Sequence, residues 1–183
     1  IAELPIAVHE GPNFPAHVLT FSRSMVRMAS FVIQGGCEVT TRRVLPAEWA
    51  PQSAVMLTWP HPGTDWADIL DEVEPVFLDI ARAVLRYENL VLSCEFVARL
   101  QDLDRDLNRY AEENGFPGRV HIVPAPANDT WARDHGPITI ATDDGPALLD
   151  FRFNAWGGKF PSEKDDALNR HLANAGVFGA TLM

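Results

Sequence analysis

The sequence predicts an α/β fold, and two observations support this prediction. Short apolar segments with the composition of buried strands recur along the chain, and segments with apolar residues at helical spacing lie between them. Their order is strand, helix, strand, helix, strand, polar loop, hairpin and helix. Alternation of this kind is typical of proteins in which helices cover a sheet.

The first predicted strand is followed directly by the first predicted helix. Ser53–Trp59 is largely apolar and is closed by Pro60, as expected for a strand that ends at a turn. Apolar residues then recur at helical spacing from Ile69 to Val84 and predict an amphipathic helix that reaches about residue 87. Because proline breaks helix interiors, we expect the main helix to begin at Pro75.

A second helix is predicted between two further strands. Leu90–Cys94 and Val120–Val123 have the composition of short buried strands. Between them, an apolar stripe predicts a helix that ends at Asn114-Gly115. The stripe consists of Phe96, Leu100, Leu103, Leu107 and Ala111.

The last third of the chain predicts a hairpin, a helix and the start of another strand. Ile138–Ala141 and Ala147–Phe151 flank Thr142–Gly145, whose composition favours a tight turn. Asp165–Ala175 predicts a third helix, and Ala180–Met183 has the composition of a strand.

Composition limits the classes of ligand and the compartment. The net charge is −10, with 25 acidic against 15 basic residues, which disfavours nucleic acid as a partner and favours cationic ligands. No apolar run approaches the length of a membrane span, so no membrane association is expected. Cys37 and Cys94 have neither disulfide-framework nor zinc-site spacing, so we expect no metal and a reducing, cytoplasmic compartment.

Functional groups are concentrated in one polar segment between two predicted strands. Residues 128–137 read Asn-Asp-Thr-Trp-Ala-Arg-Asp-His-Gly-Pro. Strands hold such a loop rigidly, which is why α/β proteins often place binding and catalytic groups there. The alternative is a surface turn whose charges pair with one another.

Two motifs resemble those of agmatine deiminases and bacterial peptidyl-arginine deiminases. They are Asn128–Pro137 and Asp150–Lys159, the second of which reads Asp-Phe-Arg-Phe-Asn-Ala-Trp-Gly-Gly-Lys. Leu45–Ser53 and Thr58–His61 also look like that family's first strand region. The resemblance covers residues 44–183 and implies a pentein fold, an α/β propeller of five blades of which this chain would hold about the first two.

The resemblance implies hydrolysis of a guanidinium group to a ureido group, with release of ammonia and without a metal or organic cofactor. The expected partner is a cationic guanidinium small molecule. Agmatine, which would give N-carbamoylputrescine in putrescine and polyamine synthesis, is preferred because Phe153–Gly158 looks more like that branch. Two alternatives stay open: a deiminase of peptidyl or free arginine, and a non-catalytic fragment that binds guanidinium compounds or partner chains.

The same resemblance assigns substrate contacts to four residues. Asp134 corresponds to the catalytic carboxylate that grips the guanidinium through paired, charge-assisted hydrogen bonds. Trp131 corresponds to an aromatic wall whose face stacks on the cation. Asn154 and Trp156 are expected to line or brace the pocket. His135 does not match the family's catalytic histidine, so we expect no part for it in proton transfer.

Other motif residues are expected to shape the loops, namely Asp129, Arg133, Gly136, Gly157 and Gly158. For Asp129 and Arg133, a mutual or nearby salt bridge explains the residue types at least as well as substrate contact does. Gly157 and Gly158 would supply a tight turn, because glycine adopts backbone conformations that other residues avoid.

The chain is expected to hold one part of a longer domain. Residues 1–43 lack clear periodicity and predict a poorly ordered leader that need not be native, whereas residues 44–183 predict the N-terminal part of a deiminase domain. In the family, a second guanidinium-binding carboxylate, the catalytic histidine and the nucleophilic cysteine follow the point that corresponds to Met183. We therefore expect this chain alone to be inactive, and a homo-oligomer is one assembly open to the full-length protein.

Overall fold

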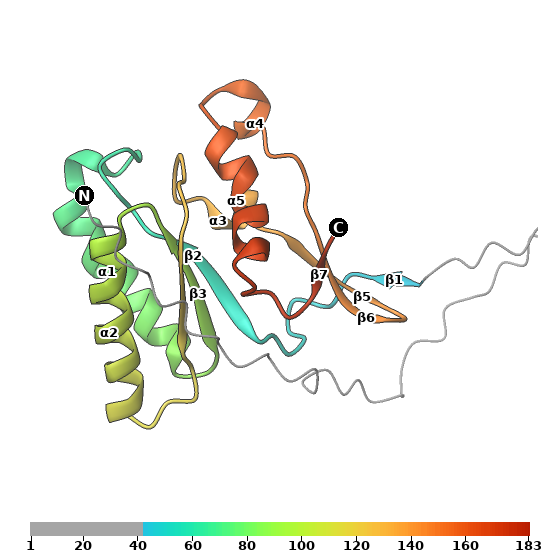
Figure 1. Ribbon diagram of the computed structural model, residues 1–183, viewed down its shortest axis with the longest axis horizontal. Coiled ribbons are helices and arrows are strands. Elements are labelled where there is room, and N and C mark those ends of the chain that lie inside the picture. Colours follow the sequence, from blue (N-terminus) through green and yellow to red (C-terminus); the bar gives the residue numbers. More distant parts are fainter. Residues whose placement is uncertain (1–41) are drawn as a thin grey trace, which may run out of the picture. The chain divides into compact units, whose positions relative to one another are not determined.

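The computed structural model describes residues 42–183, which form two β-sheets and the helices packed around them (Figure 1). The predicted leader, residues 1–43, lies outside the described residues apart from its last two. Of these, Arg43 forms the short strand β1 (Arg43–Val44). The α/β class predicted from the sequence is confirmed.

A parallel sheet of three strands supports the loop that carries the first motif. Its order is β2 (Ala54–Thr58), β3 (Asn89–Cys94) and β4 (Val120–Pro124). The crossovers contain α1 (Leu70–Leu85) and α2 (Val97–Glu113), which lie together on one face of the sheet (Figure 1). The predicted alternation of strands and helices is therefore confirmed in this half of the chain.

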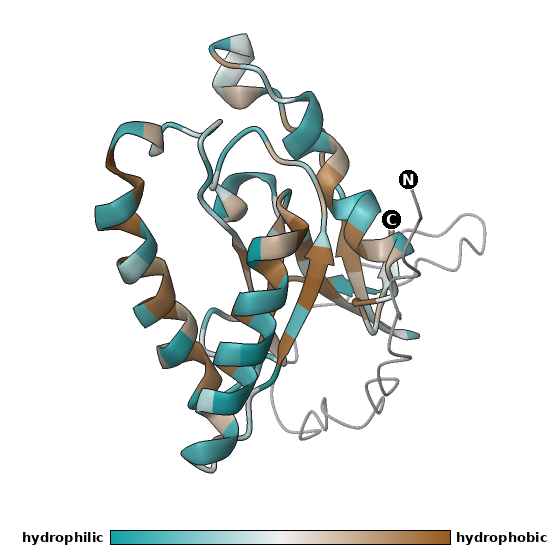
Figure 2. Ribbon diagram, turned by 60° about the vertical axis from the view of Figure 1, so that its left-hand side comes forward, coloured by the Kyte–Doolittle hydropathy of each residue, from teal (hydrophilic) through white to brown (hydrophobic). Residues whose placement is uncertain are grey.

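Both faces of this sheet are buried, as parallel sheets usually are. In β3, Leu90, Leu92 and Cys94 point into the core formed with α1 and α2. Val91 belongs to a second core on the other face, where helix α5 (Glu163–Asn174) packs. The strands are accordingly hydrophobic, whereas the colour of the helices alternates along their length (Figure 2).

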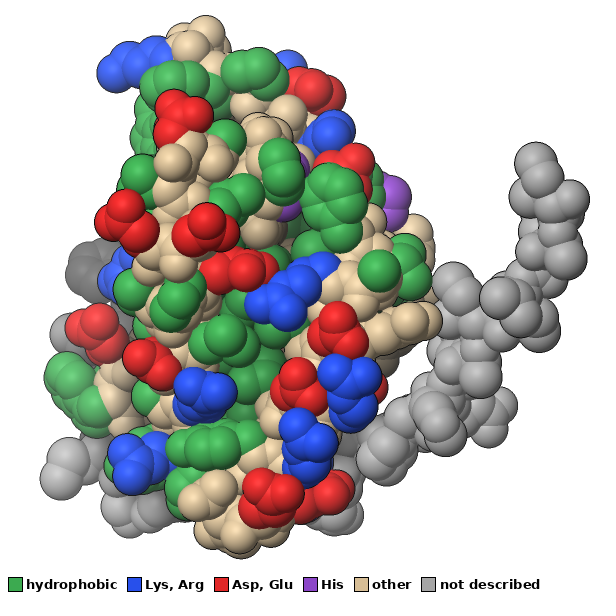
Figure 3. All heavy atoms as spheres, turned by 90° about the vertical axis from the view of Figure 1, so that its left-hand side faces the viewer, with side chains coloured by type: hydrophobic (Ala, Val, Ile, Leu, Met, Phe, Trp, Pro, Cys, Tyr) green, Lys and Arg blue, Asp and Glu red, His purple; other side chains and the backbone are tan. Residues whose placement is uncertain are grey.

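The surface formed by α1 and α2 carries charged side chains of both signs (Figure 3). On α2, Arg105 contacts Asp102 and Asp106 at 2.9 and 3.0 Å, and Arg109 contacts Asp106 at 3.1 Å. All these side chains are exposed, so the pairs contribute little to the stability of the helix.

The second sheet has the order β1-β5-β6-β7 and contains the predicted hairpin. Strands β5 (Ile138–Thr142) and β6 (Gly145–Leu149) are antiparallel, and the Thr142 hydroxyl donates to the carbonyl oxygen of Gly145 at 2.7 Å. Strand β1 pairs antiparallel with β5, and the short β7 (Thr181–Leu182) pairs parallel with β6.

The predicted start of the first helix is wrong. Helix α1 begins at Leu70, after the short 3-10 helix η1 (Ala67–Ile69), and Pro75 lies inside it. The turn before the proline is held by Glu74, whose Oε1 accepts hydrogen bonds from Trp59 Nε1 at 2.9 Å and Arg99 Nε at 2.8 Å. These tertiary bonds offset the one backbone hydrogen bond that proline removes.

Two helices of a single turn were not predicted. They are α3 (Ala132–His135) and α4 (Ala155–Gly158), and both lie within the two sequence motifs. The third predicted helix is confirmed as α5, which begins two residues earlier than expected.

Candidate functional site

The first motif leaves the carboxyl end of β4 and folds into the turn α3. The N–H of Gly136 donates to the carbonyl oxygen of Ala132 at 2.8 Å and closes this turn. A Cβ atom at residue 136 would collide with the same carbonyl oxygen. Glycine is therefore required where the motif turns into β5.

Asp129 organises the start of the loop. Its Oδ1 accepts the Thr130 N–H at 2.7 Å, and its Oδ2 accepts Trp131 Nε1 at 3.1 Å. The Thr130 hydroxyl in turn accepts Trp66 Nε1 at 2.8 Å, and the rings of Trp66 and Trp131 lie 6.3 Å apart. The carboxylate thus fixes both the backbone and the neighbouring indole.

The side chains of Arg133 and Asp134 make no hydrogen bonds of the kind that Asp129 makes within residues 42–183. The Arg133 side chain is 94% exposed, and its Nη2 lies 4.0 Å from Glu48 Oε1, a separation at which an exposed pair contributes little. Asp134 is exposed, and its side chain has no hydrogen bond or ion pair with any residue of the described range 42–183. The charges of the motif do not pair with one another, which disfavours the simple surface-turn alternative.

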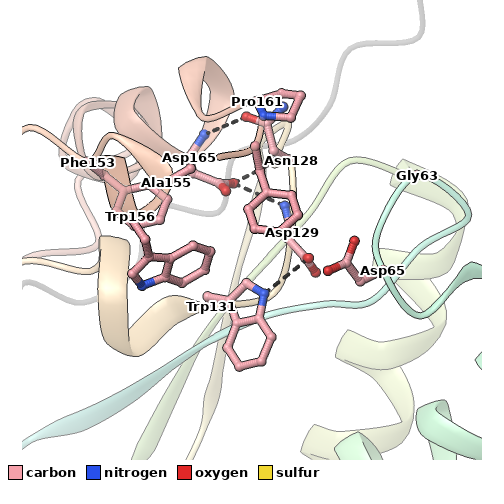
Figure 4. A pocket seen from close by; sticks show the side chains of 11 residues that line it. Gly63, Asp65, Asn128, Asp129, Trp131, Phe153, Ala155, Trp156, Pro161 and Asp165 are labelled. Atoms are coloured by element: carbon pink, nitrogen blue, oxygen red, sulfur yellow. Dashed lines mark hydrogen bonds between the residues drawn. The ribbon is translucent and has the colours of Figure 1, made fainter. Parts of the chain in front are cut away.

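Beside the loop lies a cavity of about 130 Å³ (Figure 4). Aromatic rings and carboxylates dominate its lining, and Asp65 and Asp129 point toward each other across it (Figure 4). The lining residues are Gly63, Asp65, Asn128, Asp129, Trp131, Phe153, Ala155, Trp156, Phe160, Pro161 and Asp165. Of the predicted substrate contacts, Trp131 and Trp156 lie here, whereas Asp134 and Asn154 do not.

A left-handed turn places Trp156 in this cavity. The φ angles from Ala155 to Gly158 are 47°, 53°, 90° and 78°. Asn154 holds the turn, because its Oδ1 accepts the Gly157 N–H at 3.0 Å and its carbonyl oxygen accepts the Gly158 N–H at 2.7 Å. The two glycines thus occupy backbone conformations that suit them.

Trp156 is the centre of an aromatic cluster. Its ring contacts those of Phe153, Trp131 and Phe160 edge to face, with centroid distances of 5.4, 5.9 and 6.0 Å. Such pairs stabilise by about 0.5–1.5 kcal/mol each beyond their buried area. The cluster joins the two motifs, which are separated in the sequence by a hairpin.

A buried polar layer lies beneath the loop. His135 is 2% exposed, its Nε2 lies 3.1 Å from the Thr58 hydroxyl, and the Ser93 hydroxyl donates to Thr58 Oγ1 at 3.3 Å. Burial lowers the pKa of His135 to about 4, although the negative charges of Asp134 and Asp129 partly oppose this. The imidazole is therefore neutral at pH 7, and it is not among the residues that line the cavity.

Sequence reasoning missed several residues of the cavity, among them Asp65, Phe160 and Asp165. Asp65 comes from the turn after β2 and Asp165 from α5, so neither is close to the first motif in the sequence. Within residues 42–183, no group of three or more His, Cys, Asp or Glu side chains could hold a metal ion. None of the helices in this range is long and apolar enough to cross a membrane.

Comparison with known proteins connects this arrangement to a family. Residues 44–181 match the family described as Porphyromonas-type peptidyl-arginine deiminase. The agmatine deiminase of Stutzerimonas stutzeri strain A1501 is 31% identical over 119 residues, which are 63% of this chain and 29% of that protein. The agmatine deiminase of Medicago truncatula is 32% identical over 123 residues, 62% of this chain and 30% of that protein. The chain thus spans less than a third of either relative.

Solved structures are similar in fold over a larger share of the chain. A C. jejuni agmatine deiminase variant with substrate bound gives a TM-score of 0.68 at 27% identity, over 85% of this chain and 42% of that one. A Porphyromonas gingivalis protein named as a candidate arginine deiminase is 43% identical with a TM-score of 0.63, over 77% of this chain and 40% of that one. From its sequence and its fold, the chain belongs to the Porphyromonas-type peptidyl-arginine deiminase family.

Proposed function

We propose that the chain is part of a longer deiminase that hydrolyses a guanidinium group to a ureido group and releases ammonia. The observation that carries this proposal is the state of Asp134. Its carboxylate is exposed and unpaired within residues 42–183, on a loop whose backbone is fixed at Asn128, Asp129 and Gly136. A carboxylate with free acceptor sites on a loop with a fixed backbone suits a planar cation that presents several N–H donors.

In this proposal the described residues orient the substrate and other residues perform the covalent step. Asp134 binds the guanidinium, and the ring of Trp131 stacks on it. The nucleophile is not Cys94, because that thiol is 1% exposed and burial raises its pKa, which disfavours the reactive thiolate. A cysteine and a histidine that follow this segment in the longer protein would attack the central carbon and transfer protons, with no metal or organic cofactor. The chain alone would then be inactive.

Agmatine is the substrate we propose first, and N-carbamoylputrescine the product. Support comes from two agmatine deiminases that are 31% and 32% identical to this chain. Arginine, free or peptidyl, is the second candidate. It is favoured by the higher identity, 43%, to the Porphyromonas gingivalis protein. The larger assembly would be a pentein propeller, in which this segment contributes the first blades.

The test uses the full-length protein and the substitution Asp134→Asn. This change keeps the size of the side chain but replaces a charged acceptor by a group that partly donates toward a donor. We expect kcat/KM for the preferred substrate to fall by about 100-fold or more, which corresponds to roughly 3 kcal/mol of transition-state stabilisation. Ureido product is measured with agmatine and with arginine, and the ratio of the two kcat/KM values decides between them.

Two further variants serve as comparisons. Asp144→Asn, at the exposed tip of the hairpin, changes charge equally and should leave kcat/KM unchanged. Asp129→Asn loses one of two loop hydrogen bonds and should lower the unfolding free energy by about 1 kcal/mol, with a smaller effect on catalysis than Asp134→Asn. If Asp134→Asn retains kcat/KM within a few-fold while the thermal melt is unchanged, the guanidinium site lies elsewhere.

A further inference from the structure

Helix α5 and the first motif are joined by hydrogen bonds in both directions. Asn128 Oδ1 accepts the backbone N–H groups of Lys164 at 2.8 Å and Asp165 at 3.3 Å. Asp165 Oδ1 accepts the backbone N–H groups of Asn128 at 2.7 Å and Asp129 at 3.3 Å (Figure 4). Ser162, at the usual capping position, makes no side-chain cap. Asn128 therefore caps α5 from outside the helix, and Asp165 returns the equivalent bonds to the loop.

The same side of α5 also holds the second motif. Asp166 Oδ1 accepts the Phe153 N–H at 2.7 Å. One turn further along, Asn169 Nδ2 donates to the carbonyl oxygen of His135 at 2.8 Å and to Asp150 Oδ1 at 2.9 Å. Both motifs are thus attached to a single helix, and of the three contacts just described, those of Phe153 and His135 are made through the backbone and that of Asp150 through its side chain.

Burying the carboxylate of Asp165 at this position costs desolvation free energy. It is 2% exposed, and aspartate is rarely so buried unless it is paired with a cation. The basic side chain nearest to it in an ion-pair geometry is His135, whose Nδ1 lies 3.9 Å from Asp165 Oδ2, beyond hydrogen-bonding distance. Packing does not require a carboxylate here, because Leu168 and Leu172 already anchor the helix in the core.

We propose that Asp165 is a positioning residue for the guanidinium site. By holding the amides of Asn128 and Asp129, it fixes the start of the loop that carries Trp131 and Asp134. The effect is passed on through Asp129, whose carboxylate binds the indole N–H of Trp131. The role in substrate binding rests on the proposed function. The effect of Asp165 on the order of the loop can be measured without an activity assay.

The structural measurement is amide hydrogen exchange of the chain, followed by NMR. In Asp165→Ala, exchange at Asn128 and Asp129 should accelerate by about tenfold or more relative to the amides of β3, because a buried charged acceptor is lost. Asp165→Asn should stay within a few-fold of the original rates, since its amide oxygen still accepts both hydrogen bonds. The control Leu172→Ala lowers stability through the core of the same helix and should accelerate all amides without singling out these two.

The functional measurement uses the full-length protein with the same three variants. Asp165→Ala should lower kcat/KM by about tenfold or more, Asp165→Asn should restore most of it, and Leu172→Ala should leave it unchanged at a temperature where the protein is folded. Unchanged exchange at Asn128 and Asp129 in Asp165→Ala overturns the inference. So does an Asp165→Asn variant as impaired as Asp165→Ala, because charge rather than hydrogen bonding would then be responsible. If the original protein shows no deiminase activity but the exchange rates change as expected, the proposed function fails and the positioning of the loop stands.

Discussion

The turn that carries Trp156 consists of residues in a conformation that only glycine adopts readily. Ala155 and Trp156 have φ angles of 47° and 53°, and for each the left-handed conformation costs roughly 1–2 kcal/mol. The cost is offset by the two hydrogen bonds to Asn154 and by the aromatic contacts of Trp156. Strained backbone of this kind is concentrated at binding sites, where surrounding contacts maintain it.

Substitution of Gly157 by alanine measures the free-energy cost of the left-handed backbone conformation at this position. Its φ is 90°, and no atom lies within 4 Å of the position that a Cβ would occupy, so no collision contributes. Gly157→Ala should lower the unfolding free energy by about 1–2 kcal/mol, measured by urea denaturation. Gly115→Ala, with a φ of 65° and equally open space, is the matched control far from the cavity. Only Gly157→Ala should shift the indole N–H resonance of Trp156, and equal shifts in both variants would contradict a local role for the turn.

The sequence motifs indicate some residues of the site but not the residues that hold these in place. The resemblance drew attention to Trp131 and Trp156, and the structure brings both into one aromatic cluster. Asp165 had no such signal, because its importance depends on contacts with amides 36 and 37 residues away. An acidic residue in the first turn of a helix is ordinary, and nothing in its neighbours distinguishes it from Asp166.

Among the elements, α2 could be predicted because its apolar spacing matches its buried face. Leu100, Leu103 and Leu107 are each at most 2% exposed, and the predicted end of the helix was one residue from the observed one. The start of helix α1 is harder to predict, because the hydrogen bonds of the Glu74 side chain stabilise a turn that the following proline would otherwise disfavour. Val76 and Ile80, which are among the apolar residues at helical spacing between Ile69 and Val84, are 55% and 42% exposed. The single-turn helices α3 and α4 are too short to show any periodicity.

Glu74 should accordingly be more important for stability than its neighbours on α1. Its carboxylate is the hydrogen-bond acceptor for Trp59 Nε1, and the Trp59 side chain is fully buried. Glu74→Ala leaves that donor without a partner, so we expect the unfolding free energy to fall by about 1–3 kcal/mol. Glu72→Ala, on the exposed side of the same helix, should change it by no more than about 0.5 kcal/mol. Urea denaturation of both variants is the measurement, and equal midpoints would show that Glu74 does not anchor the helix.

For the molecule as a whole, two buried ionisable groups change the unfolding free energy in opposite directions as pH rises. Burial lowers the pKa of His135 from 6.5 to about 4, so the stability associated with its neutral form is lost as pH falls from 6.5 through 4. Burial raises the pKa of Asp165 from 3.8 to about 6, although hydrogen bonds from Asn128 and Asp129 partly oppose this. The stability associated with protonated Asp165 is complete below pH 3.8 and is lost as pH rises through 6. Between pH 4 and 6 the two effects oppose each other.

Replacing either group should therefore leave the pH dependence contributed by the other group visible in the unfolding free energy. Compared with the original chain, the unfolding free energy should fall more, or rise less, from pH 4 to 6 in His135→Gln, and it should rise more, or fall less, in Asp165→Asn. Either change in slope is limited to about 1.4 kcal/mol per pH unit, since one proton is involved. Urea midpoints across this range measure both variants against the original chain. Slopes that change in the same direction would show that the two groups do not oppose each other.

The cap that Asn128 gives to α5 has a consequence for the order of folding. Helix α5 has 12 residues, and isolated helices below about 12–15 residues are marginal in water. Its first turn has no cap of its own, so the helix gains its N-terminal hydrogen bonds only after the loop beyond β4 has docked. We expect the parallel sheet with α1 and α2 to form in the transition state, and α5 to acquire its structure afterwards. The second motif is attached to α5 through Phe153 and Asp150, so the cavity would be the last part of this segment to be assembled.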